Sequence, residues 1–245
     1  MSLNERHNHI LSYLREKKSA SVGELASKLF VSEATVRRDL TEMQKLGLIE
    51  RSHGGAVLSD NAEEVSIFVR MNKNSKEKEQ TAANALSHLP EFRSVFIDSS
   101  STALALAVRM DLSYKTVVTN NLQTAIMLSG KKDINLIILG GCVQYNTVSS
   151  TGSFTSRQIE EFSFDLMISS CAAVQGAEVY ESSLEQKEIK TAAMKRSRYK
   201  ILLFDSTKST SYGAYKIADL KDYDVVVTNT PPCEKIMESG VKIIY

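Results

Sequence analysis

From about residue 76 onward the chain alternates between short β-rich runs and helix-like stretches, and this alternation limits the possible fold more than any other feature. The runs are apolar on both faces, as in strands that are buried on two sides. Such strands, separated by helices, predict a mostly parallel, doubly wound α/β sheet. We expect strands at 94–97, 116–119, 135–139, 166–169, 200–204, 225–228 and 241–244, and helices at 77–89, 102–110, 122–129, 154–162 and 184–198.

The first 58 residues follow a different pattern, that of three helices and a short hairpin. Ser21 and Glu24 form a capping box that opens a second helix, and Ser32 caps a third. Gly47 is expected to end the third helix, and two short strands, 48–51 and 56–58, then flank a His-Gly-Gly turn. The pattern predicts a helix-turn-helix followed by a two-stranded wing.

Charge is distributed unevenly along the chain. The net charge of +1 for the whole protein carries no nucleic-acid signal, but residues 1–58 hold nine Lys or Arg against seven Asp or Glu, a net charge of +2. Three of the four histidines also lie in this segment. The sign of the asymmetry agrees with a nucleic-acid-binding module at the N-terminal end.

The third helix has two distinct faces. Val36, Leu40 and Met43 share one face at helical spacing, so the opposite face should be exposed. Arginine there can bind guanine, Thr and Ala can contact the thymine methyl group, and Lys can bind phosphate. We expect DNA contacts from Ser32, Ala34, Thr35, Arg37, Arg38, Thr41, Lys45, Arg51 and His53. The alternative is a helical domain whose basic residues are simply solvated.

We assign residues 1–58 to the DNA-binding domain, 59–75 to a linker and 76–245 to the α/β domain. The linker carries an isolated apolar patch, Ile67-Phe68-Val69, which we interpret as docking partly on one of the domains. A further short helix is the alternative for this segment.

Polar loops follow several of the predicted strands, where ligands bind in open parallel sheets. The serine-rich run 98–102 opens a helix, so its backbone N–H groups and hydroxyls can hold an anion, although a plain N-cap explains it equally well. Gly140 and Gly141 permit close backbone approach or make a tight turn. Lys208 can neutralise a phosphate or remain solvated. Together these loops predict a pocket.

Much of the chain resembles the DeoR family of transcriptional repressors. The run Val31-Ser32-Glu33-Ala34-Thr35-Val36-Arg37-Arg38-Asp39-Leu40 and the segment Gly47–Ala56 are similar to its DNA-binding domain. The loops 98–102, 139–141 and 205–208 are similar to its effector domain, which is related to ribose-5-phosphate isomerase. The resemblance implies operator binding, release by a phosphorylated sugar or related metabolite, and effector contacts from Asp98, Ser100, Ser101, Thr102, Gly140, Gly141 and Lys208.

Three positions depart from the family pattern. Ser100 stands where the family usually has Gly, and Asn229 where Asp is common. Gln186 stands where the family's glutamate is expected, in a segment that includes Glu185 and Lys190. These departures lie in the expected effector domain and bear on which metabolite it binds.

Two other functions compete with a ligand-controlled repressor. One is a sugar-phosphate isomerase with a fused DNA-binding head, for which Asp98, Asp205 and Glu185 are the available carboxylates. The other is a DNA-binding protein without a ligand. We expect no catalytic residue, cofactor, metal site or membrane partner, and we expect the protein in the cytoplasm. We also expect a homo-oligomer, because operators are usually paired half-sites. Cys142, Cys171 and Cys233 are interpreted as buried, reduced thiols.

Overall fold

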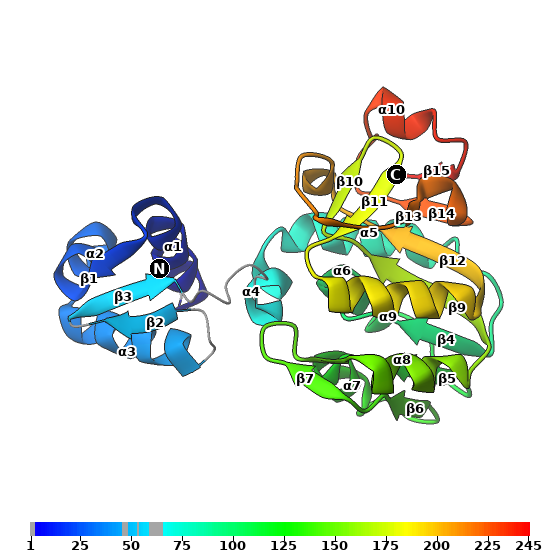
Figure 1. Ribbon diagram of the computed structural model, residues 1–245, viewed down its shortest axis with the longest axis horizontal. Coiled ribbons are helices and arrows are strands. Elements are labelled where there is room, and N and C mark those ends of the chain that lie inside the picture. Colours follow the sequence, from blue (N-terminus) through cyan, green and yellow to red (C-terminus); the bar gives the residue numbers. More distant parts are fainter. Residues whose placement is uncertain (1–2, 46–48, 53, 59–65) are drawn as a thin grey trace. The chain divides into compact units, whose positions relative to one another are not determined.

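The computed structural model describes residues 3–45, 49–52, 54–58 and 66–245. The chain divides into two compact units, one of residues 1–73 with 145–147 and one of residues 74–144 with 148–245. Figure 1 shows the elements of both units. The predicted helix end at Gly47 and the wing residue His53 lie outside the described residues.

The N-terminal unit contains the predicted winged helix-turn-helix. Its helices are α1 (Leu3–Lys17), α2 (Val22–Leu29) and α3 (Glu33–Lys45), and its strands are β1 (Ser19–Ser21), β2 (Ile49–Ser52) and β3 (Gly55–Leu58). The strands pair antiparallel in the order β1-β3-β2. Strand β1, which the sequence pattern did not indicate, passes so close to β3 that a Cβ on Gly55 would lie 2.2 Å from the carbonyl oxygen of Ala20.

Caps set the bounds of α2 and α3 as predicted. Ser21 accepts a hydrogen bond from the Glu24 backbone N–H at 3.2 Å, and Glu24 accepts one from the Ser21 N–H at 2.7 Å. The Ser32 hydroxyl accepts the N–H of Thr35 at 3.2 Å. Helix α2 ends at Phe30, whose left-handed backbone (φ 54°) starts the turn toward α3.

A short helix, α4 (Ile67–Asn72), occupies the apolar part of the segment expected to be a linker. Ile67 is buried, and Val69 packs against the core of the N-terminal unit. The alternative interpretation of a further helix is therefore confirmed for these residues. Of the three apolar side chains of the patch, Ile67 and Val69 therefore pack inward, whereas Phe68 is exposed.

The second unit is built on a seven-stranded parallel sheet in the order β15-β14-β12-β9-β4-β5-β6. Its strands are β4 (Ser94–Ile97), β5 (Thr116–Thr119), β6 (Asn135–Ile138), β9 (Phe164–Ser170), β12 (Ser197–Leu203), β14 (Val225–Val227) and β15 (Lys242–Ile244). Every pairing in this sheet is parallel. The predicted mostly parallel, doubly wound α/β sheet is confirmed.

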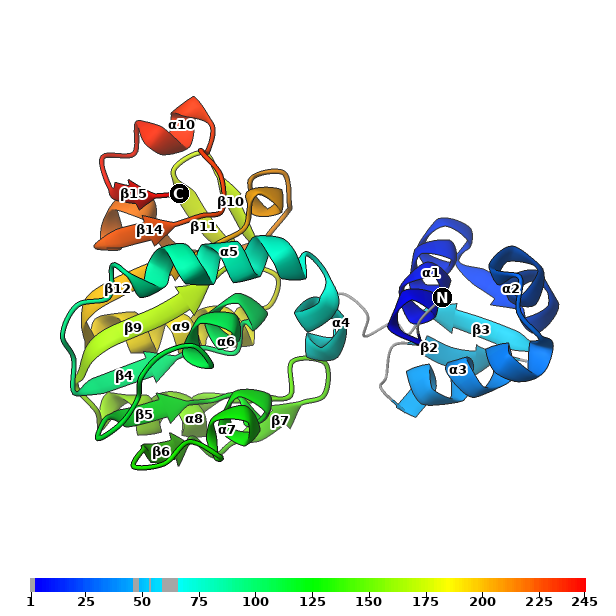
Figure 2. The ribbon, with the colours of Figure 1, turned by 180° about the vertical axis from the view of Figure 1, so that it is seen from behind.

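Helices cover both faces of the sheet. On the face seen in Figure 1 lie α8 (Ser153–Glu160) and α9 (Leu184–Lys195), and on the face seen in Figure 2 lie α5 (Ser75–Leu86), α6 (Ser101–Ala107) and α7 (Leu122–Leu128). Successive strand side chains enter opposite cores. Ile97 packs in the core beneath α6, whereas Phe96 packs in the core beneath α8 and α9.

Short elements that the sequence did not indicate complete this unit. A small antiparallel sheet joins β10 (Ala173–Gln175), β11 (Glu178–Glu181) and β13 (Tyr215–Asp219), and β7 (Cys142–Gln144) pairs with β8 (Ser149–Thr151) as a hairpin. Helix α10 (Glu234–Met237) and two 3-10 helices, η1 (Ser206–Ser209) and η2 (Leu220–Asp222), lie near the C-terminal end of the chain.

The cysteines differ from expectation. Cys171 is buried, and burial raises the pKa of its thiol to about 12. Cys142 and Cys233 are exposed, because β7 is a surface hairpin strand and Cys233 is the N-cap of α10. The prediction that all three are buried was wrong for these two.

Candidate nucleic-acid interface and candidate effector site

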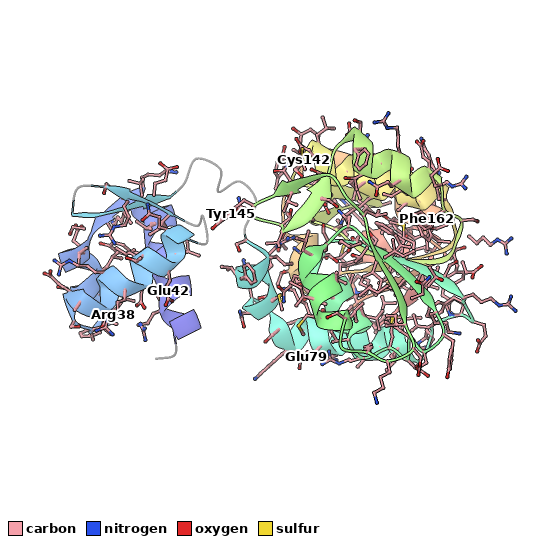
Figure 3. All side chains as sticks on the ribbon, turned by 90° about the horizontal axis from the view of Figure 1, so that it is seen from below. Arg38, Glu42, Glu79, Cys142, Tyr145 and Phe162 are labelled. Atoms are coloured by element: carbon pink, nitrogen blue, oxygen red, sulfur yellow. The ribbon has the colours of Figure 1, made fainter. Side chains whose placement is uncertain are left out.

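Helix α3 separates its side chains as the helical wheel predicts. Val36, Leu40 and Met43 are completely buried in the N-terminal core. Ala34, Arg38 and Thr41 are exposed on the other side. Figure 3 labels Arg38 on this helix. The helix therefore presents a small residue, a long cation and a hydroxyl to whatever lies outside it, which is the chemistry that can recognise base edges in a major groove.

Five of the predicted DNA contacts have partners within the protein. Arg37 is exposed and forms an ion pair with Glu33 at 2.6 Å. The Thr41 hydroxyl donates to the Arg37 carbonyl at 2.8 Å, and half-buried Arg51 donates to the same carbonyl at 3.5 Å. Ser32 and Thr35 share a hydrogen bond between their hydroxyls at 2.9 Å. Among the described residues Arg38 has no such partner, so its guanidinium is free to contact DNA.

Two predicted contacts cannot be placed in this way. Lys45 is the last residue of α3, but its side chain lies outside what the structure describes, as does the whole of His53. Both therefore stay predictions.

An ion pair that the sequence did not indicate fixes the orientation of α3. Asp39 is buried on the inner side of the helix, and Arg6 of α1 holds it with two hydrogen bonds, Nε to Oδ2 at 2.7 Å and Nη2 to Oδ1 at 2.9 Å. A bidentate arginine–carboxylate pair restricts rotation more than a single contact does. Because Arg38 precedes Asp39, this pair also sets the direction in which Arg38 leaves the helix.

In the second unit, buried polar side chains gather at the carboxyl ends of the parallel strands. Asp98 follows β4, and both of its oxygens are used. Oδ1 accepts the Ser100 N–H at 2.9 Å, and Oδ2 accepts the Ser170 N–H at 2.9 Å and the Ser169 hydroxyl at 2.8 Å. Asp98 therefore ties the loop after β4 to the end of β9. It is also nearly inaccessible to solvent.

Lys190 of α9 is the cation of this cluster. Its Nζ lies 2.9 Å from Asp98 Oδ2 and 2.5 Å from Glu181 Oε1, and it donates to the Ser170 carbonyl at 2.5 Å. All three ionisable groups are buried. Two carboxylates and one ammonium leave this cluster with a formal charge of −1.

Electrostatics keep the pair between Asp98 and Lys190 ionised. Burial alone would raise the pKa of Asp98, but the Lys190 ammonium and hydrogen bonds from Ser100 and Ser170 hold that pKa below its usual value. Burial alone would lower the pKa of Lys190, but the two carboxylates hold it above its usual value. Glu185, the other residue of this segment that the sequence pointed to, is exposed.

Ser100 is the N-cap of α6. Its hydroxyl accepts the Ala103 N–H at 3.1 Å, and its backbone (φ −85°, ψ 147°) is one that any residue adopts. The position thus needs no glycine, and the serine adds a cap to the helix. Ser101 and Thr102 follow in the first turn and are buried.

Gln186 joins three segments of the candidate site. Its Oε1 accepts the Ser99 hydroxyl at 2.7 Å, and its Nε2 donates to the Ser149 hydroxyl at 2.8 Å. The amide therefore links α9 to the loop after β4 and to β8. A carboxylate could not donate to Ser149 and would add a charge next to Asp98 and Lys190.

Gly140 and Gly141 pack against α8. Gln158 binds Gly140 from both sides, accepting its N–H at 3.1 Å and donating to its carbonyl at 2.9 Å. A Cβ on Gly141 would lie 2.1 Å from the Thr155 hydroxyl oxygen. Close packing against α8 is thus a structural reason for glycine at 141, and a role of both glycines in ligand binding stays a prediction.

Two buried acceptors at the carboxyl ends of the parallel strands have no hydrogen-bond partner among the described residues. They are Oδ1 of Asn120, after β5, and Oδ2 of Asp205, after β12. Asp205 uses its other oxygen for Thr207, and half-buried Lys208 lies in the 3-10 helix that Asp205 opens. Buried acceptors rarely lack a partner, so a donor from outside the chain is expected at each.

Comparison with known proteins decides the family. The DeoR C terminal sensor domain matches residues 73–230, and the DeoR-like helix-turn-helix domain matches residues 6–62. The chain belongs to the DeoR family. This DeoR-family protein is thus a DNA-binding transcriptional regulator, and the predicted winged helix-turn-helix followed by an α/β sensor domain is confirmed.

Individual relatives of this DeoR-family chain are regulators by name. It is 31% identical to the HTH-type transcriptional regulator GolR of Listeria innocua, over 98% of this chain and 97% of the relative. It is 29% identical to the glycerol-3-phosphate regulon repressor of Escherichia coli, over 97% and 95% of the two chains. The regulator interpretation is therefore confirmed over the isomerase.

A solved ribose-5-phosphate isomerase in complex with phospho-erythronic acid has a TM-score of 0.40 and 15% identity to this DeoR-family chain, covering 55% of this chain and 54% of the isomerase. The likeness is partial and adds nothing to the family assignment. Within the described residues, no helix is long and apolar enough to span a bilayer, and no group of His, Cys, Asp or Glu side chains could hold a metal ion.

Proposed function

We propose that this regulator is a repressor that binds paired operator half-sites through α3 and is released by a phosphorylated sugar or a related metabolite. The observation that carries the DNA half is Arg38, an exposed cation on a helix whose opposite face is wholly buried. The named function of the Escherichia coli relative, repression of a glycerol-3-phosphate regulon, supports both repression and a phosphorylated polyol as the signal.

The polar side chains at the carboxyl ends of the parallel strands support the proposed binding of a metabolite. A sugar offers hydroxyl donors, and Asn120 Oδ1 and Asp205 Oδ2 are acceptors that need them. Lys208, three residues after Asp205, supplies a positive charge for a phosphate. The family resemblance assigns further contacts to Asp98, Ser100, Ser101 and Thr102. In our proposal Asp98 does not itself contact the metabolite but holds the loop that carries Ser100, Ser101 and Thr102.

The proposal also includes oligomer formation and location. Operators recognised by helix-turn-helix proteins are commonly paired, so two copies of α3 must be presented together. We place the protein in the cytoplasm because bacterial operator DNA is there. Ligand and operator would then compete through the arrangement of the paired heads, as a population shift.

Replacing Arg38 with alanine tests the DNA half. Arg38→Ala should weaken operator binding by roughly 1–3 kcal/mol and relax specificity at one base position, because a base-reading arginine contacts a single guanine. Affinity is measured by fluorescence anisotropy on the operator, on single-base variants and on random DNA. Arg157→Ala is the matched control, since Arg157 is an exposed arginine on α8.

The outcome on random DNA separates the possible roles of Arg38. Equal weakening on operator and random DNA would make Arg38 a phosphate contact rather than a base contact. An unchanged affinity on every sequence contradicts a role for α3 in recognition.

The metabolite half is tested by thermal shift of the full chain with phosphorylated sugars, the matching free sugars and inorganic phosphate. A true effector should raise the melting temperature and should also lower operator affinity, because both effects follow from binding one state better than the other. Free sugar alone should have little effect if the phosphate is recognised. Absence of any shift across the phosphorylated panel supports a ligand-independent DNA-binding protein instead.

A further inference from the structure

The two edge strands of the parallel sheet differ in the charges that they carry. Strand β15 forms one edge, with Lys242 on it and Glu234, Lys235 and Glu238 in and beside α10 just before it. Strand β6 forms the other edge. Around β6, residues 116–130 and 134–156 contain no Asp, Glu, Lys or Arg, and the charges between these two ranges are Lys131, Lys132 and Asp133 in the turn before β6, although 24% of the whole chain is charged.

The surface along β6 is also apolar. Ile126 and Met127 of α7 and Ile138 of β6 are exposed, and α7 packs next to β6. Beyond the end of β6, exposed Val143 lies on β7, and the exposed ring of Phe154 lies beside Gly140. We call Ile126, Met127, Ile138, Val143 and Phe154 the β6 surface. Figure 1 shows α7, β6 and β7 together at the lower end of the sheet.

Such an edge is unusual for a chain that stays alone. A strand at a sheet edge has unpaired backbone N–H and C=O groups, and proteins ordinarily guard it with charged side chains. Loss of charge combined with exposed large apolar side chains is instead the composition of the core of a protein–protein interface. Strand β15 itself carries Lys242, whereas no residue of β6 is charged and the nearest charges before β6 lie in the turn 131–133.

We propose that the β6 surface is where two copies of this chain associate, with β6 of one copy antiparallel to β6 of the other. The partner must offer an uncharged surface, because an unpaired charge would lose its water without compensation. It must also offer a free strand edge. A second copy related by a two-fold axis offers both, since a two-fold interface places the same patch on each side.

The inference rests on the proposed function in one respect, the need to bring two copies of α3 to paired half-sites. Its own support is the charge pattern and the exposed side chains of the sensor unit. The association is accordingly measured without DNA, so that a failure to bind operator and a failure to dimerise remain separate results.

Sedimentation velocity of the full chain over a range of concentrations tests the proposal. Met127→Lys and Ile138→Lys place a charge in the surface and should weaken dimerisation about tenfold or more, because the lysine is buried without a partner. Met237→Lys is the matched control, since Met237 is 45% exposed on α10 beside the other edge and Met127 is 47% exposed. The control should sediment like the wild-type chain.

Three results overturn the proposal: a wild-type chain that is monomeric at every concentration, lysine variants that dimerise like wild type, or a control variant that dissociates equally. Hydrogen exchange of the wild-type chain provides a reading that does not depend on variant folding. Exchange of the amides at 135–138 should slow as protein concentration rises, while exchange at 242–244 should not change. Equal behaviour of the two edges contradicts the assignment.

Discussion

At Lys190 one ammonium group serves two buried carboxylates that come from different parts of the sensor unit. Asp98 lies at the end of β4, Glu181 ends β11, and Lys190 lies on α9. Removing one partner of a buried ion pair leaves an uncompensated charge, which costs far more than the pair contributes in total. The stability of this edge of the sheet therefore depends on Lys190 more than on either carboxylate.

Replacing Lys190 with methionine, which keeps most of the side-chain volume, should lower the free energy of unfolding of the sensor unit by about 3–5 kcal/mol at pH 7. Asp98→Asn is the milder comparison, because Lys190 keeps Glu181 and the amide oxygen can still accept one of the two backbone N–H groups, of Ser100 or Ser170. Urea denaturation gives the values. Equal losses in the two variants would contradict the central role of Lys190.

The loss in Lys190→Met should also depend on pH. The folded-state pKa of Asp98 is lowered, so Asp98 contributes stability that is present above its unfolded pKa, about 3.9, and is lost as pH falls through the folded value. The folded-state pKa of Lys190 is raised, so its contribution is full below about pH 10 and lost only as pH rises through the folded value. The difference in free energy of unfolding between the wild type and Lys190→Met should therefore shrink in acid, because protonated Asp98 no longer needs the ammonium group.

Among the elements, the turn between α2 and α3 contains a strained residue. Phe30 adopts the left-handed conformation (φ 54°, ψ 43°), while its side chain is 94% exposed. A Cβ in this conformation costs on the order of 1 kcal/mol, and the exposed ring returns little burial energy. The helix-turn-helix accepts this strain where glycine would be the ordinary choice.

Phe30→Gly should therefore raise the free energy of unfolding of the helix-turn-helix by about 0.5–1 kcal/mol, after allowing for the greater freedom of glycine in the unfolded chain. Phe30→Ala keeps the Cβ and should stay close to wild type. Native-state hydrogen exchange of amides in α2 and α3 measures the change within this unit. A glycine variant no more stable than the alanine variant would show that the backbone strain is negligible.

Sequence patterns predicted some elements well and others not at all. Strands β4 and β5 have the predicted bounds because they are apolar on both faces, which no surface loop imitates. Strands β7 (CVQ), β8 (SST) and β10 (AVQ) were missed because each contains polar residues and no continuous apolar run, unlike β14 (VVV), which is equally short. The inner face of helix α3 was predicted correctly because its apolar residues recur at helical spacing in the sequence.

At the scale of the whole molecule, the limit is distance along the chain. The loop after β4 was predicted as part of the site, but its partners were not. Nothing local indicates that Asp98 meets Lys190, that Gln186 joins Ser99 to Ser149, or that Arg6 holds Asp39. The contacts of Asp98 and Gln186 form only once the sheet order brings β4, β9 and α9 together, and the contact of Arg6 forms only once α1 packs against α3. No periodicity in the sequence records either arrangement.

The strand order also has a consequence for synthesis of the protein. Strands β4, β5 and β6 are neighbours in both sequence and sheet, and β9, β12, β14 and β15 are then added outward on the other side of β4, one after another. Domains fold from the N-terminal end as the chain leaves the ribosome. The head is therefore made first, the β6 edge second, and Lys190 and Asp205 last. Under the proposed function, a growing chain acquires the means to hold DNA before it acquires the means to release it.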